Sequence, residues 1–114
     1  MTRGSVVLVP FPFDDLSGAK VRPAVCLTEP VGPHRHVVLA FLTSQVPGEP
    51  LDSDLVLLPE MPGFEATGLR VPSALRLHRL LTVSTSIIAR KLGILPADLM
   101  RAVEGRLGRL FGIG

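Results

Sequence analysis

Prolines and glycines interrupt the apolar stretches of this sequence so often that they limit the length of its secondary-structure elements. Eleven prolines and eleven glycines are spread over 114 residues. In the first two-thirds, the apolar runs between them have the length of about 4–8 residues that is typical of β-strands. Proline lacks the N–H that a sheet interior needs, and glycine adopts turn conformations readily. This part of the chain therefore predicts a small all-β barrel or sandwich.

Five segments are predicted as strands, separated by turn-forming loops: Ser5–Val9, Val21–Thr28, His36–Thr43, Leu55–Leu58 and Ser73–Val83. The third segment is apolar enough to be buried on both faces. Partial alternation in the fifth predicts two faces, one with Ala74, Arg76 and His78 and the other with Leu75, Leu77 and Arg79.

The last third of the chain changes to helical periodicity. Ser84–Leu92 is predicted as a short helix that ends at Gly93. A second helix is expected from the first-turn position of Pro96 to Gly112, with an apolar face at Leu99, Val103, Leu107 and Leu110. The expected fold class is mainly β (α+β): a small barrel of five to six strands with a short helix and a C-terminal helix, in one domain over residues 1–114.

Composition adds an expectation about assembly. Hydrophobic residues make up 46% of the chain and the mean hydropathy is +0.43. A chain this short has little interior in which to bury so much apolar surface. We therefore expect part of it to face a partner, and a homodimer is the commonest arrangement.

Several classes of protein and site are not expected. No apolar run approaches the roughly 18–20 residues of a membrane span, and no signal peptide is recognisable, so we expect no membrane association and a cytoplasmic location. The single cysteine, Cys26, fits a reducing compartment. His34 and His36 have no Cys or acid nearby to complete a metal site, so no metal is expected. The sequence also has no Gly-rich phosphate loop, and no other cofactor is expected.

Charge is unevenly distributed along the chain. The net charge is +2, and ten of the twelve cations are arginine. From Arg70 onward, seven arginines and one lysine face only two acids, Asp98 and Glu104. A basic face of this kind could meet nucleic acid or an acidic partner, although by itself it is more simply a solvated surface.

The segment Lys20-Val21-Arg22-Pro23 enters a predicted strand directly after a glycine-containing loop. Residues two apart on a strand share a face, so Lys20 and Arg22 point the same way. The neighbouring proline would hold Arg22 rigidly enough to meet a phosphate or a developing phosphorane charge. The structural alternative is an ion pair with Asp14 or Asp15.

Two further polar groups are candidates. Thr43, Ser44 and Gln45 follow the most apolar strand and could bind phosphate, or could simply cap the strand end. Arg76 and His78 share a predicted face, and His78 could exchange a proton near neutral pH or be an ordinary hydrogen-bonding residue.

Three motifs together resemble one known family. The long run Gly4–Val25, which contains Phe-Pro-Phe-Asp-Asp-Leu-Ser-Gly-Ala-Lys-Val-Arg-Pro-Ala, resembles the opening of MazF/PemK-type toxins. Ala40–Gln45, a buried strand that ends in Thr-Ser, is similar to the second motif, and Gly68–Leu77 is similar to the third. The resemblance implies an SH3-like barrel with a C-terminal helix, dimerised around a groove for RNA. It also implies metal-independent cleavage of single-stranded RNA by attack of the ribose 2′-hydroxyl on the adjacent phosphate.

The resemblance also implies roles for individual residues. Arg22 and Thr43 match the family's catalytic arginine and threonine. His78 stands where many members have Asp, so it could replace that residue as acid or base or leave the site altered. The implied RNA-binding residues are Phe11, Lys20, Ser44, Gln45 and Arg76.

The implied partners are single-stranded RNA and a cognate antitoxin with an acidic tail, with contact to DNA only indirectly through the antitoxin complex. Two alternatives stay open. One is a toxin on the same barrel that binds without cleaving, such as a topoisomerase poison or a degenerate toxin. The other is a small-barrel interaction module in which Arg22 and Thr43 are structural.

Overall fold

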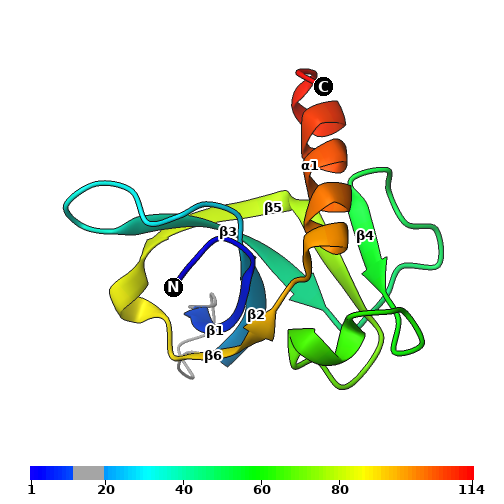
Figure 1. Cartoon of the computed structure of the whole chain (residues 1–114), viewed down its shortest axis with the longest axis horizontal. Coiled ribbons are helices and arrows are strands. Elements are labelled where there is room, and N and C mark those ends of the chain that lie inside the picture. Colours follow the sequence, from blue (N-terminus) through cyan, green and yellow to red (C-terminus); the bar gives the residue numbers. More distant parts are fainter. Residues whose placement is uncertain (12–19) are drawn as a thin grey trace.

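The computed structural model describes residues 1–11 and 20–114, and the side chain of Phe11 lies outside what it describes (Figure 1). The described residues form six strands, two 3-10 turns and one α-helix. Their bounds are β1 Ser5–Phe11, β2 Lys20–Cys26, β3 His36–Thr43, β4 Asp54–Leu57, η1 Phe64–Thr67, β5 Ser73–Ser84, η2 Thr85–Ile87, β6 Arg90–Ile94 and α1 Ala97–Phe111. All five predicted strands are present, with ends shifted by up to two residues and with β3 as predicted.

The six strands form one antiparallel sheet in the order β4-β5-β3-β2-β1-β6. The sheet curls into a half-barrel, and within the described chain its edge strands β4 and β6 do not pair with each other (Figure 1). The predicted class, mainly β with a C-terminal helix, is confirmed. Among the described residues, no helix has both the length and the apolar composition of a membrane span.

The predicted helix over Ser84–Leu92 is wrong. Only Thr85–Ile87 forms a single 3-10 turn, and the chain then continues as β6, which pairs with β1. The outer edge of β1 needs a hydrogen-bonding partner, and this demand outweighs the local helical pattern. Gly93 is therefore a strand residue and not a helix cap. A Cβ on it would lie 2.2 Å from the carbonyl oxygen of Ala66 in η1, so only glycine fits.

Two apolar cores lie on opposite faces of the sheet. Neighbouring strand residues point to opposite faces, and the adjacent Val6 and Val7 belong to different cores. The helix-side core joins the sheet to α1 and η1, and its buried residues are Val6, Val25, Ala40, Leu42, Leu55, Leu57, Phe64, Leu75, Leu77, Leu95, Leu99, Met100 and Val103. The opposite core consists of Val7, Val9, Ala24, Cys26, Val37, Leu39, Phe41 and Val83. Since β3 contributes to both, its predicted burial on two faces is confirmed.

Helix α1 begins after Pro96, which is the N-cap and not the predicted first-turn residue, and it ends at the left-handed Gly112. Leu99 and Val103 are buried as predicted, but Leu110 is exposed. Figure 1 shows why: the helix starts beside β4 and β5, and its C-terminal end extends away from the sheet.

The pairing of β5 with β3 is interrupted by a shift of register. Ala40 pairs with Leu80 but Phe41 pairs with Arg76, so Leu77, His78 and Arg79 lie outside the ladder. A bulge of this kind interrupts the alternation of faces. The predicted facing of Arg79, opposite to Arg76, is therefore wrong, because both line one cleft.

Candidate active site

Two neighbouring clefts open where β2, β3 and β5 come together, and they share the lining residues Arg22, Leu42, Thr43 and Gln45. The first cleft has a volume of about 300 Å³ and is completed by Phe41, Arg76 and Arg79. The second has about 340 Å³ and is completed by Pro23, Ser44, Leu69, Val71 and Ser73. The shared residues thus stand between a cationic cleft and a more apolar one.

Strand register explains why Arg22 and Thr43 meet. Ala24 on β2 pairs with Phe41 on β3, and two residues farther along the antiparallel strands lie Arg22 and Thr43. Residues directly opposite on neighbouring strands share a face. Both side chains therefore project from the face of the opposite core, beyond its last apolar side chains.

Arg22 is held within a regular strand rather than in a loop. Its backbone lies opposite Val9 of β1, Pro23 follows it, and its side chain is half-buried. A guanidinium on such a support loses little freedom when it binds a phosphate. The alternative partners Asp14 and Asp15, like the rest of the predicted RNA-bordering loop between Phe11 and Lys20, lie outside the described residues.

Thr43 occupies the last position of β3, and its Oγ1 accepts a hydrogen bond of 3.1 Å from the backbone N–H of Gln45. The strand-end cap considered from the sequence is therefore present. It does not exclude ligand binding, because a hydroxyl that accepts one bond can still donate its proton to another acceptor. The turn also directs Gln45 into both clefts and Ser44 into the second.

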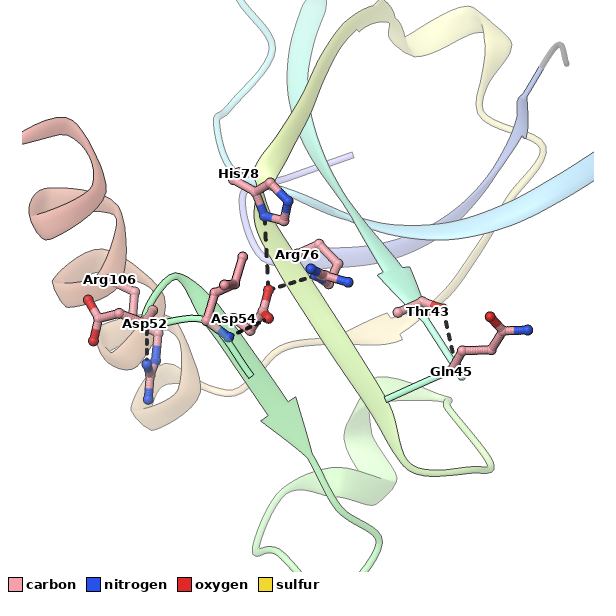
Figure 2. A network of polar contacts seen from close by, with 8 residues as sticks. Thr43, Gln45, Asp52, Asp54, Arg76, His78 and Arg106 are labelled. Atoms are coloured by element: carbon pink, nitrogen blue, oxygen red, sulfur yellow. Dashed lines mark hydrogen bonds and ion pairs between the residues drawn. The ribbon is translucent and has the colours of Figure 1, made fainter. Parts of the chain in front are cut away.

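A buried carboxylate organises the polar residues beside the first cleft (Figure 2). Asp54 begins β4 directly opposite Arg76 of β5, and its side chain has 0% exposure. Its Oδ1 accepts a bond of 2.7 Å from Arg76 Nε, and its Oδ2 accepts one of 2.8 Å from the backbone N–H of Leu51. His78 Nδ1 lies 4.0 Å from the same Oδ1, within ion-pair range but too far for a hydrogen bond.

The predicted site residues separate into two groups. Arg22, Thr43, Ser44, Gln45 and Arg76 line the clefts. His78 is 36% exposed beside Asp54, and it is not among the described residues that line either cleft. Lys20 is exposed at the start of β2 and is likewise outside that set.

Two residues of this region were missed from the sequence. Arg79 was placed on the wrong face, because the bulge in β5 has no clear local signature. Asp54 belongs to no recognisable sequence motif. Only its hydrogen bond with Arg76, 22 positions away, connects it to the site. The arginine excess after Arg70 was the available signal for Arg79.

The chemistry of the first cleft favours an anion. Three arginines, a hydroxyl and a carboxamide line it, and no carboxylate is among its described lining residues. Guanidinium groups bind phosphate oxygens in pairs of parallel hydrogen bonds. Among the residues the structure describes, no three His, Cys, Asp or Glu side chains gather as a group that could hold a metal ion.

Comparison with solved structures shows the same fold in bacterial toxins. The Mycobacterium tuberculosis toxin MazF-mt6 aligns with a TM-score of 0.68 at 23% identity, covering 95% of this chain and 98% of that one. A MazE-MazF structure from Deinococcus radiodurans gives a TM-score of 0.76 at 21% identity, with coverages of 100% and 97%. A mycobacterial endoribonuclease in complex with its cognate antitoxin gives 0.68 at 16%, with coverages of 100% and 97%.

No curated protein sequence matches this chain. The family model described as "PemK-like, MazF-like toxin of type II toxin-antitoxin system" matches residues 2–111. That match spans nearly the whole chain, including β1 through α1, and agrees with the fold of the solved relatives. This protein is therefore a member of the PemK-like, MazF-like toxin family of type II toxin–antitoxin systems.

Proposed function

We propose that this toxin is a metal-independent endoribonuclease that cleaves single-stranded RNA at selected sequences, and so inhibits translation and growth. The observation that carries the proposal is the placement of Arg22 and Thr43 together in the wall shared by two clefts, one of them lined by Arg76 and Arg79. A chain of phosphates needs several cationic contacts along its path. Family membership supports the same activity, because endoribonucleases are typical of it.

The proposed reaction is an internal transesterification. The ribose 2′-oxygen bonds to the adjacent phosphorus as its proton leaves, and the bond from phosphorus to the 5′-oxygen breaks as that oxygen takes up a proton. The products are a 2′,3′-cyclic phosphate and a 5′-hydroxyl. Arg22 would stabilise the charge of the phosphorane, and Thr43 would donate a hydrogen bond to a phosphate oxygen or position the 2′-hydroxyl. His78 is the proposed proton carrier.

The RNA would run along both clefts. Arg76 would hold a phosphate, Ser44 and Gln45 would contact the strand at the shared wall, and Phe11 and Lys20 would border it. The proposed partners also include a cognate antitoxin, which fits the antitoxin complexes among the structural relatives, and a second copy of the chain. The proposed location is the cytoplasm, with DNA contacted only through the antitoxin complex.

The test is cleavage of a long single-stranded RNA by the purified protein in EDTA, with Arg22→Ala in parallel and the product ends analysed. We expect discrete fragments with 2′,3′-cyclic phosphate ends, and a rate about 10²–10³-fold lower for the variant, as for loss of one donor to a developing charge. Arg101→Ala is the matched control, because it removes an exposed arginine of α1 that lines neither cleft. Normal cleavage by Arg22→Ala would refute the site assignment.

A second candidate function is a toxin of the same fold that binds a target without cleaving RNA. It is favoured by His78, which lies beside Asp54 and outside the described lining of the clefts. This candidate predicts growth inhibition by a protein that leaves every RNA tested intact. Cleavage by the wild-type protein that is lost in His78→Ala would exclude it and support His78 as the proton carrier.

A further inference from the structure

Asp54 bonds directly to Arg76, which lines the cationic cleft, yet Asp54 itself is not among the described residues that line the cleft. Its side chain has 0% exposure, so a ligand in the cleft has no access to its oxygens. A buried ionised carboxylate is costly unless hydrogen bonds and an opposite charge compensate it. Here the compensation comes from the backbone N–H of Leu51 and from Arg76, which does line the cleft.

Arg76 divides its guanidinium between two tasks. The Nε–H bonds Asp54 at 2.7 Å, while the side chain keeps 24% exposure and forms part of the cleft wall. Figure 2 shows the guanidinium between Asp54 and the end of β3, where Thr43 lies. Because the group is planar and its donors are fixed in one plane, a bond at Nε fixes the direction of both terminal NH₂ groups.

The strand register reinforces this arrangement. Asp54 and Arg76 are a directly opposed pair of β4 and β5, and Arg76 is in turn opposite Phe41 of β3. The backbone therefore holds the carboxylate and the guanidinium on the same face, next to the strand that carries Thr43. No rearrangement of either strand is needed to bring Arg76 to a phosphate in the cleft.

We propose that Asp54 is a positioning residue for RNA: it holds Arg76 so that the terminal NH₂ groups of the guanidinium bind a phosphate in the first cleft. The inference rests on the proposed function and deepens it, because it explains how the phosphate contact proposed for Arg76, next to Arg22, is preorganised. The arrangement requires arginine at position 76. A lysine ammonium is a single point charge that can pair with Asp54 or reach the cleft, but cannot do both.

A double-mutant cycle tests this coupling. The wild type, Asp54→Asn, Arg76→Ala and the double variant are compared for binding of a 2′-O-methyl RNA, which lacks the attacking hydroxyl and cannot be cleaved. We expect each single variant to bind on the order of tenfold more weakly, as for loss of an arginine contact to nucleic acid. Because Asp54 acts through Arg76, the double variant should bind no more weakly than Arg76→Ala alone. The proposal would be overturned if the losses of affinity of the two single variants added up in the double variant. It would also be overturned if Asp54→Asn bound RNA as tightly as the wild type.

A second variant keeps the test decisive if Asp54→Asn fails to fold. Arg76→Lys retains the charge and leaves Asp54 in place, and we expect it to bind as weakly as Arg76→Ala; wild-type affinity would overturn the proposal. Asp98→Asn is the matched control, since it removes the carboxylate of an exposed Asp–Arg pair on α1 and should leave binding unchanged.

The same proteins are also assayed for RNA cleavage, so that failure of the enzyme and failure of the coupling are distinguished. A wild type that binds RNA without cleaving it would refute the ribonuclease, while the binding cycle would still decide the role of Asp54. A folded wild type that neither binds nor cleaves any RNA tested would overturn both.

Discussion

Asp52 and Asp54 stand two residues apart at the entry to β4, and each pairs with an arginine, but in opposite surroundings. Asp52 is 70% exposed at its side chain and receives bonds of 2.9 and 3.3 Å from Arg109 of α1. Its backbone carbonyl also accepts a bond of 2.7 Å from Arg106, which Figure 2 shows on the helix side of β4. Asp54 turns away from α1, has no exposure, and pairs with Arg76 beside the clefts.

The difference shows that what an Asp–Arg pair contributes depends on whether it is exposed or buried. In water, the attraction between Asp52 and Arg109 is screened, and the pair serves to fasten α1 to the loop before β4. Around Asp54 the charges are desolvated, so removing one partner leaves a buried, uncompensated group. The exposed pair therefore adds one contact between α1 and the loop before β4. The buried pair fixes the position of Arg76 in the candidate active site.

The largest effect is expected from breaking the buried pair. Asp54→Ala should lower the free energy of unfolding by about 2–3 kcal/mol, because Arg76 and the N–H of Leu51 lose their acceptor. Urea unfolding followed by circular dichroism measures this loss, with Asp52→Ala as the matched variant on the exposed side. If both variants lost the same stability, the contrast between the two pairs would be wrong.

An intermediate effect is expected from protonation of the exposed pair. The hydrogen bond from Arg109 holds the pKa of Asp52 below its ordinary value. Since the folded-state pKa is the lower one, the pair stabilises the fold above the ordinary carboxyl pKa of about 4, and this contribution is lost as pH falls through the folded-state pKa. The stability difference between wild type and Asp52→Asn should therefore shrink between about pH 5 and about pH 2. A difference that stayed constant over this range would contradict the assignment.

The smallest effect is expected from salt. Raising the ionic strength from about 0.1 M to about 1 M shortens the Debye length from about 10 Å to about 3 Å, which screens exposed charges far more than buried ones. The stability cost of Asp52→Asn should decrease with salt, while that of Asp54→Ala should stay nearly the same. Thermal unfolding of the three proteins at both salt concentrations measures this. A cost of Asp54→Ala that fell in parallel would mean that water reaches the buried pair.

Local sequence patterns predicted much of the sheet and part of the site. The apolar run of β3 indicated a strand buried on both faces, and its position in both cores confirms this. The motif around Arg22 and the polar end of β3 at Thr43 indicated residues that the structure does bring into one wall. Their roles in catalysis and RNA binding remain predictions.

Local sequence patterns gave the wrong prediction, or none, where contact with a distant segment determined the structure. Arg90–Ile94 has a weak pattern of its own and became a strand because β1 offered an unpaired edge. Arg79 joined the cleft because β5 bulges against β3. Asp54 looked like an ordinary loop residue until β4 paired with β5.

By itself, the sequence determined the five strands from β1 to β5, which residues are apolar enough for two cores, and which polar side chains stand at strand ends, because these follow from local composition and spacing. Only the tertiary structure decided that Arg22 lies across from Thr43 and that Asp54 holds Arg76. The reason is that strand register is set by non-local backbone pairing and by burial on both faces of the sheet, and neither is encoded in the neighbourhood of a single residue.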